Sequence, residues 1–212
     1  MNILVVAATS MELRPLKIAI DQKMESVQLD FLNAGVGMVS TAYHLSRQIC
    51  TKSYDLAINI GIAGSFGREI PLGTVVEVHS DRFSELGAED DGQFIDLVQM
   101  KLQAENDFPF QRNLLLGDAP IPSTLRKVNG ITVNKVHGKE SSIEKIKDRL
   151  DPDVESMEGA AFLYVCKMEK LPCIQLRAIS NYVEKRDTSN WRIADALQNL
   201  TAETYKYISL YA

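Results

Sequence analysis

Two short polar clusters carry the side chains that are best suited to chemistry. The first contains Met157 and Glu158, and the second contains Ser180 and Asn181. Between the clusters the sequence predicts a helix and then an apolar, buried strand. The first cluster would therefore lie at a strand-to-helix corner and the second at a strand end. Ligand sites gather at the carboxyl ends of strands in open α/β sheets, so we expect the clusters to belong to one site.

The first cluster has the side chains that could bind a sugar. The carboxylate of Glu158 can accept two hydrogen bonds from a vicinal diol, and Met157 offers a pliable apolar face for a sugar ring. A helix N-terminus at this place would also favour an anion. The same pattern is typical of an acid that only caps an ordinary helix, and the residues alone leave both interpretations open.

The second cluster and one acid near the N-terminus could complete such a site. The amide of Asn181 both donates and accepts, so it can hold a heterocycle that has a carbonyl beside a ring nitrogen. Glu12 lies where a helix should begin after the first strand, and a buried carboxylate there could act as a general base for water. The alternatives are a turn-forming asparagine and a surface acid that complements a helix dipole.

Several other features do not indicate a cofactor. The stretch Gly61-Ile-Ala-Gly brings backbone N–H groups to a strand end, but it lacks the dinucleotide-binding GxGxxG pattern and the P-loop lysine. His44, His79 and His137 are scattered, and we expect them to be structural or solvent-facing. No cluster has metal-ligand spacing. We therefore expect neither a metal nor a cofactor.

The totals describe one ordinary globular domain. The chain has 212 residues, of which 45% are apolar and 24% charged. That length can bury most of the surface that the unfolded chain exposes, so we expect a single domain over residues 1–212. The formal net charge of -5 disfavours a nucleic-acid binder that relies on phosphate contacts.

The sequence also predicts a cytoplasmic protein without a membrane partner. The apolar run at 3–7 is too short for a signal-peptide core and has no basic leader. No stretch approaches the roughly 20 apolar residues of a membrane span. Cys50, Cys166 and Cys173 are odd in number and lie in apolar contexts. We expect them to be reduced core residues.

Hydrophobic periodicity predicts alternating strands and helices, which favours a largely parallel sheet covered by helices. We expect residues 81–118 to be irregular, with 93–118 a surface excursion over a pocket or a subunit interface. Strands are expected at 3–7, 27–32, 55–60, 74–79, 130–136 and 173–179, and helices at 11–21, 38–50, from about 142 to 150, 160–170 and 189–211.

Four motifs occur in order along the chain: Ile-Leu-Val-Val-Ala-Ala at 3–8 followed by Glu12, Asn-Ile-Gly-Ile-Ala-Gly at 59–64, Ser-Met-Glu at 156–158, and Arg-Ala-Ile-Ser-Asn at 177–181. Together they resemble the nucleoside phosphorylase/nucleosidase family, and the resemblance runs from Met1 to Tyr211. It implies an α/β fold in one domain, with a central mixed, partly barrel-like sheet flanked by helices.

The resemblance also implies roles for individual residues. Glu12 would activate water, Gly61 would lie in the loop on the ribose side, and Asn181 would recognise the base. It further implies a small-molecule nucleoside substrate and a homodimer or larger homo-oligomer, in which a neighbouring chain closes the pocket. The remaining substrate-binding positions implied by the matched motifs are Met157 and Glu158 at the ribose and Ser180 near the base.

Two departures from the family pattern narrow the expected reaction. Adenine-specific members carry an aspartate where this chain has Asn181, and an amide cannot donate a full proton to the base. An amide can hydrogen-bond N7 and O6 of a 6-oxopurine, which favours a hypoxanthine-type base. Phosphorylases of the family place Ser or Thr where this chain has Ile62, so water is favoured over phosphate as the nucleophile.

Two further stretches, 81–90 and 180–187 followed by Trp191, resemble a hydrolase subgroup that releases hypoxanthine from a nucleoside with a carboxyphenyl tail. Arg82 and Arg186 are candidates for binding that tail. The alternatives that stay open are an adenine-type or other purine nucleosidase, a purine nucleoside phosphorylase, and a protein that binds nucleosides without cleaving them.

Overall fold

The apolar runs form the strands of the core. The computed structural model describes residues 1–20 and 26–212. Three strands pair in parallel through its centre: β1 (Asn2–Ala7), β3 (Leu56–Ser65) and β10 (Cys173–Tyr182). β-branched and other apolar residues dominate these strands, and most of their side chains are fully buried. The predicted strands at 3–7, 55–60 and 173–179 are therefore confirmed.

The strands close into a ring rather than an open sheet. β10 pairs antiparallel with β4 (Val75–Asp81), which pairs parallel with β8 (Arg126–Thr132). β8 pairs parallel with β9 (Val154–Ser156), and β9 returns antiparallel to β3. β2 (Gln28–Asn33) extends the sheet beyond β1. The mixed, partly barrel-like sheet is confirmed. Most of the described pairings in this sheet are parallel, as the alternation suggested, but the sheet is closed.

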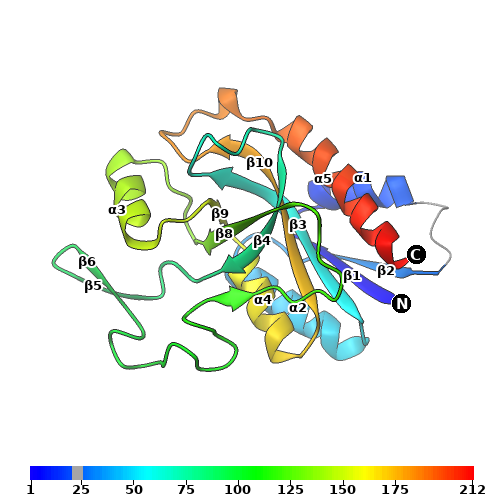
Figure 1. Cartoon of the computed structure of the whole chain (residues 1–212), viewed down its shortest axis with the longest axis horizontal. Helices are drawn as coiled ribbons and strands as arrows, with labels where there is room; N and C mark the ends of the chain where they lie inside the picture. The colour runs from blue at the N-terminus through cyan, green and yellow to red at the C-terminus, as the bar shows by residue number, and fades with distance from the viewer. Residues whose placement is uncertain (21–25) are drawn as a thin grey trace.

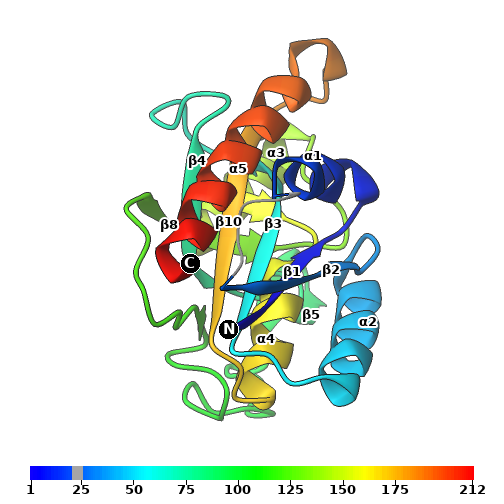
Figure 2. The ribbon, with the colours of Figure 1, turned by 90° about the vertical axis from the view of Figure 1, so that its right-hand side faces the viewer.

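Helices cover both faces of the central strands. α1 (Ser10–Ile20) and α5 (Ile193–Ile208) pack on one face, and α2 (Met38–Thr51) and α4 (Gly159–Met168) pack on the other. Figures 1 and 2 show the strands between these two pairs of helices. α3 (Glu140–Leu150) packs instead against the end of β8 through Ile146.

The region predicted to be irregular contains a hairpin and a short edge strand. β5 (Gly87–Asp90) and β6 (Gln93–Asp96) pair antiparallel and protrude from the body, as Figure 1 shows. β7 (Leu115–Leu116) pairs with β4. The rest of 97–125 forms turns and extended segments. None of the helices in the described part of the chain has the length and apolar character to cross a membrane.

Several predicted boundaries are shifted. β3 runs on through the glycine stretch to Ser65, and β10 includes Ser180 and Asn181, because these two strands pair with each other along their length. β8 begins at Arg126, and its last residue is Thr132. The last helix begins at Ile193, after a 3₁₀ turn over Thr188–Asn190. The expected end of the first helix, Asp21, lies outside the described residues.

The cysteine prediction is partly wrong. Cys166 and Cys173 are buried and free, as expected, but Cys50 is exposed near the end of α2. The apolar residues around Cys50 in the sequence belong to the other face of that helix, which packs against the sheet through residues such as Leu45.

Candidate active site

Glu12 is a buried carboxylate in the first turn of α1. Its side chain is only 9% exposed. The backbone N–H and the hydroxyl of Thr9 donate to Oε2 at 2.9 and 2.8 Å, and the backbone N–H of Ile62 donates to Oε1 at 3.3 Å. An ionised carboxylate has about four acceptor positions, so the carboxylate can still accept a hydrogen bond from a water molecule. The surface-acid interpretation is therefore wrong.

Arg177 lies beside Glu12 at the middle of β10 and is 1% exposed. Burial lowers its pKa below the ordinary arginine value, and the charges of Glu158 and Glu12 oppose that shift. Gly61 makes room for this contact, because a Cβ there would lie 3.0 Å from both Arg177 Nη1 and Glu12 Oε1. Arg177 Nε has no hydrogen-bond partner within the described residues.

Glu158 lies on the other side of Arg177. It is the residue just before α4, and its Oε1 accepts a hydrogen bond of 2.9 Å from the backbone N–H of Gly37. Burial raises the pKa of Glu158 above the ordinary glutamate value, while Arg177 and the Gly37 N–H oppose that rise. The preceding Met157 is partly exposed. The structure therefore brings Glu12 and Glu158 together around one buried guanidinium.

A buried chain of hydrogen bonds also holds Arg177. Arg177 Nη2 donates to Asn59 and, at 3.2 Å, to Gln175 Oε1. Gln175 Nε2 donates to Asp81 Oδ2 at 2.9 Å. Asp81 Oδ1 in turn accepts from the hydroxyl of Thr132 at 3.0 Å. Burial raises the pKa of Asp81 to about 7, although its hydrogen bonds from Thr132 and the Arg82 N–H oppose the rise.

The same chain holds the first turn of α4. The backbone N–H of Ala160 donates to Thr132 Oγ1 at 2.7 Å, which satisfies one of the free N–H groups at the helix start. Gly159 is required here, since a Cβ would lie 2.0 Å from Gln175 Oε1 and 2.2 Å from Asp81 Oδ2. Asp81 is thus linked both to the arginine and to the helix turn that carries Glu158.

Asn181 lies further along β10, after a change of register. The pairing with β3 shifts between Ile179 and Asn181, so Ser180 occupies a bulge, a feature that re-aims side chains beside active sites. Ser180 is buried, and its hydroxyl donates to Asn181 Oδ1 at 2.9 Å. Asn181 Nδ2 donates to the carbonyl of Tyr182 at 3.0 Å.

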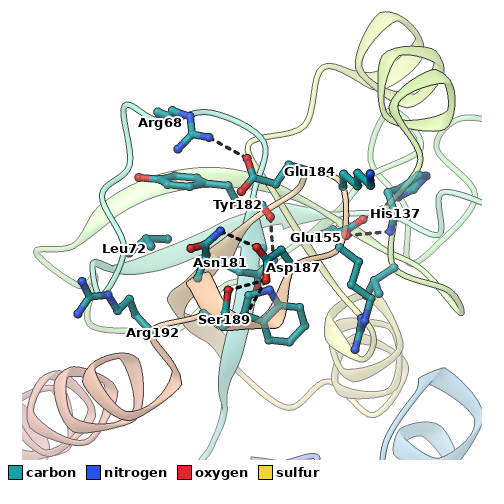
Figure 3. A pocket seen from close by; sticks show the side chains of 16 residues that line it. Arg68, Leu72, His137, Glu155, Asn181, Tyr182, Glu184, Asp187, Ser189 and Arg192 are labelled. Atoms are coloured by element: carbon teal, nitrogen blue, oxygen red, sulfur yellow. Dashed lines mark hydrogen bonds and ion pairs between the residues drawn. The ribbon is translucent and has the colours of Figure 1, made fainter.

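Asn181 faces a cavity of about 700 Å³. Figure 3 shows Asn181 with the Glu155–His137 pair and the side chains of the segment that follows β10. Arg68 stacks over the ring of Tyr182 at 4.5 Å, and the guanidinium of Arg186 lies 5.0 Å from the Trp191 ring. The charged residues that line this cavity are Arg68, Glu155, Glu184, Lys185, Arg186, Asp187 and Arg192.

The two candidates for binding a tail are placed differently. Arg186 lines the cavity beside Asn181. Arg82 does not line this cavity, because it follows the last residue of β4 and lies near Asp96 and Phe83. Burial lowers the pKa of Arg82, and the charges of Asp96 and Asp81 oppose that shift.

The carboxylate cluster and the cavity are two ends of one edge of the barrel. The described residues that line the cavity do not include Glu12, Met157 or Glu158. Each end nevertheless uses the same strands. Along β3, Gly61 contacts the cluster and Gly64 the cavity, about 10 Å further on. That separation is comparable to the length of a purine nucleoside.

Several residues of the site could not be identified from the sequence motifs. Asp81, Gln175 and Asn59 form the buried chain below Arg177, and the signal that could have found them was polar residues inside strands that are otherwise apolar. His137 was expected to be structural or solvent-facing, but it lines the cavity and pairs with Glu155 at 2.7 Å. Within residues 1–20 and 26–212, no group of three or more His, Cys, Asp or Glu could hold a metal ion.

Known proteins are similar to this chain over most of its length. The family model of the phosphorylase superfamily matches residues 31–209. A futalosine hydrolase from Streptomyces coelicolor is 29% identical over 81% of this chain and 75% of its own length. A futalosine hydrolase from Thermus thermophilus is 27% identical over 80% of this chain and 76% of its own length.

Solved structures share the fold. A 5′-methylthioadenosine/S-adenosylhomocysteine nucleosidase from Helicobacter pylori superposes with a TM-score of 0.83 at 12% identity, covering 99% of this chain and 98% of that chain. A futalosine hydrolase mutant from the same species gives a TM-score of 0.83 at 13% identity, with 99% of each chain covered. The family resemblance inferred from the motifs is confirmed.

Proposed function

The chain belongs to the phosphorylase superfamily, and from that premise we propose that it hydrolyses the N-glycosidic bond of futalosine. The products are hypoxanthine and dehypoxanthine futalosine, in the alternative menaquinone pathway. The futalosine hydrolases of Streptomyces coelicolor and Thermus thermophilus, which are similar over most of this chain, support the substrate.

One observation carries the proposal. Two carboxylates, the buried Glu12 and the partly buried Glu158, flank Arg177 at one end of the barrel edge, and an amide, Asn181, faces a cavity at the other end. A nucleoside laid along this edge places its ribose at the carboxylates and its base in the cavity. Glu158 then binds the ribose hydroxyls, Met157 packs on the sugar, and Asn181 holds the base at N7 and O6.

The same arrangement suits a transition state with a positive sugar and a negative base. Breaking the glycosidic bond builds oxocarbenium character on C1′, and a site must bind that charge better than the ground state. The ionised form of Glu12 complements that charge and can take a proton from the attacking water. Its contacts with Thr9 and Ile62 hold the carboxylate in place before the substrate arrives.

Water is the better nucleophile at this site than phosphate. Ile62 has no hydroxyl to offer a phosphate, and its backbone N–H already donates to the Glu12 carboxylate. The negative charges of Glu12 and Glu158 would also repel a phosphate dianion. Asn181 disfavours adenine nucleosides, because its neutral amide cannot protonate an adenine leaving group.

We also propose that the protein acts in the cytoplasm as a homodimer or larger homo-oligomer. The three cysteines are all free, which suits a reducing compartment. Exposed apolar side chains on α2 and the preceding loop, Val36, Val39 and Tyr43, support an interface next to Gly37 and Glu158.

The test is a base-release assay. The protein is incubated with futalosine, inosine and 5′-methylthioadenosine, each with and without phosphate, and the free base is quantified. We expect hypoxanthine from futalosine at the same rate in both buffers. Release only with phosphate would indicate a phosphorylase, release mainly from methylthioadenosine an adenine nucleosidase, and binding without release a nucleoside-binding protein.

A further inference from the structure

We propose that His137 is the acid that gives a proton to the departing purine, and that Glu155 is the positioning residue that orients it. This inference rests on the proposed futalosine hydrolysis and deepens it. It assigns a catalytic role to a side-chain pair that lies outside the carboxylate cluster and outside the motifs that indicated the family.

The proposed reaction needs a proton donor for the departing base, and Asn181 cannot be that donor. When the glycosidic bond breaks, its electron pair moves onto the purine, and a 6-oxopurine leaves more readily if a proton neutralises it. The Asn181 amide can hydrogen-bond the base, but it has no proton to give up at neutral pH. A second group in the same cavity must therefore supply the proton, or the base must leave as an anion.

The His137–Glu155 pair has the geometry of an oriented acid. His137 Nδ1 lies 2.7 Å from Glu155 Oε2, and the backbone N–H of His137 donates to Oε1 at 3.1 Å. The two side chains are 13% and 4% exposed. An ionised carboxylate only accepts hydrogen bonds, so Nδ1 carries hydrogen, and the other ring nitrogen, Nε2, is left as the proton-donating position.

The pair and Asn181 border one glycine. A Cβ on Gly64 would lie 3.2 Å from Asn181 Nδ2 and 3.7 Å from Glu155 Cγ, so the amide and the carboxylate side chain stand on the same side of β3. Asn181, Glu155 and His137 all line the 700 Å³ cavity, as Figure 3 shows. A purine lying against Gly64 would therefore meet the amide at one edge and the pair at another.

The charges around His137 come from four elements. Glu155 of β9 contacts the imidazole directly. A second cavity on the far side of His137 adds Glu89 of β5 and the cations Lys145 and Arg149 of α3. Arg186, in the segment after β10, packs against the neighbouring Gly138. The contact with Glu155 is buried, whereas the cations are more exposed and solvent screens them.

The proton balance of the step is complete. The C1′–N9 bond of the nucleoside breaks, and its electron pair stays on the purine. The imidazolium of His137 transfers its Nε2 proton to that purine and becomes neutral imidazole, still bonded to Glu155 through Nδ1–H. The oxygen of water bonds to C1′, and the proton of that water passes to Glu12. Both residues return to their starting states by exchange with solvent.

The experiment compares two leaving groups in the variant His137→Gln. Futalosine needs a proton on its base, whereas 7-methylfutalosine carries a cationic base that leaves without one, with the same sugar and tail. A lost general acid typically costs 10² to 10⁴ in rate, so we expect about a 100-fold fall in kcat for futalosine. For 7-methylfutalosine we expect less than about a threefold change, because no proton transfer is lost. His79→Gln, which removes a histidine of β4 that does not line the cavity, should leave both rates unchanged.

A second variant keeps the test decisive if His137→Gln does not fold. Glu155→Gln keeps one acceptor oxygen, which can still accept from His137 Nδ1–H, but removes the negative charge, and it should show the same difference between the two leaving groups. Equal losses for both substrates would overturn the acid assignment and leave a purely structural pair. If the wild-type protein releases no hypoxanthine from futalosine, the proposed function itself fails, and this inference fails with it.

Discussion

The two ends of the site differ in how firmly their side chains are held. At the sugar end, Arg177 of β10 and Glu12 of α1 are buried and held by several hydrogen bonds each. At the base end, Asn181 and His137 face an open cavity, much of whose wall comes from residues 184–192 after the last strand. The first region is part of the barrel, and the second is shared between the barrel and a loop.

The difference matches what each end has to do. Stabilising a developing charge requires groups that are already oriented, because reorganising them would cost part of the rate. Recognising a particular base or tail depends on residues that can vary without breaking the fold, and loops suit that role. We therefore expect substitutions at the sugar end to affect stability and rate, and substitutions at the base end to affect which substrate is used.

The largest effect should come from Asp81, below the sugar end. Its pKa of about 7 in the folded protein exceeds the 3.8 of an unperturbed aspartate, so folding favours the neutral form. This contribution to the free energy of unfolding is fully present below about pH 4 and is lost as the pH rises to about 7. Each pKa unit is worth about 1.4 kcal/mol, so the loss amounts to a few kcal/mol.

Urea unfolding at about pH 4.5 and about pH 7.5 measures this effect. The stability of the wild type relative to Asp81→Asn should decrease with rising pH, because asparagine does not titrate. Glu77→Gln is the matched control: it neutralises another buried acid of β4, which accepts from Ser123. That variant should keep the pH dependence of the wild type. Parallel curves for wild type and Asp81→Asn would contradict the assignment.

The next effect in size is the loss of the proposed base. Glu12→Gln keeps the side chain's shape and its contact with Ile62 but removes the charge. Losing general base catalysis should lower kcat by at least about 100-fold, with little change in KM if Glu158 binds the ribose. Steady-state kinetics with futalosine measure both constants. A variant that retains near-full kcat would show that Glu12 is not the base.

Much of the fold could be predicted from the sequence because local patterns determine it. The apolar run at 3–7 and the periodic helix at 38–50 appear in the structure within a residue or two. The closed ring could not be predicted that way. It depends on the pairing of β3 with β9 and of β8 with β4, and such long-range pairing leaves no mark on the periodicity of either strand. Only the family resemblance indicated it.

The sequence motifs indicated some residues of the candidate site. They did not indicate the residues whose state depends on burial. Glu12 and Glu158 were named from their motifs, and the structure places them together around Arg177. Asp81 was missed, because a polar residue at the end of a strand gives no sign that burial and a glutamine from the distant segment that forms the neighbouring strand β10 will determine its state. His137 was set aside for the same reason, since its partner Glu155 comes from a different strand.

Two glycines of β3 allow the two ends to be compared directly. In Gly61→Ala the new methyl would meet Arg177 and Glu12 at 3.0 Å, and both neighbours are held by hydrogen bonds. We expect a loss of about 1–3 kcal/mol in stability, as for overpacked cores, and a fall in kcat of about tenfold. Thermal unfolding and kinetics with futalosine give the two quantities.

Gly64→Ala is the partner variant at the base end. Its methyl would meet Val183 at 2.9 Å and Asn181 at 3.2 Å, and the Asn181 side chain can shift into the cavity that it lines. We expect a smaller loss of stability and mainly a raised KM. Equal effects of the two substitutions on stability would show that the sugar end is no more rigid than the base end.

The smallest expected effect comes from Asn181→Asp. We expect this variant to change the preference between the two bases rather than the total activity. A carboxyl group can protonate an adenine base and would repel the oxygen of a 6-oxopurine, while Ser180 can still donate to it. The ratio of kcat/KM for inosine to that for adenosine should fall by about tenfold, the value of one or two exchanged hydrogen bonds. Ser80→Ala, which removes a buried hydroxyl bonded to Asn129 on β8, is the control and should not change this ratio. An unchanged ratio in Asn181→Asp would mean that the base is recognised elsewhere in the cavity, and the His137–Glu155 pair would be the first place to look.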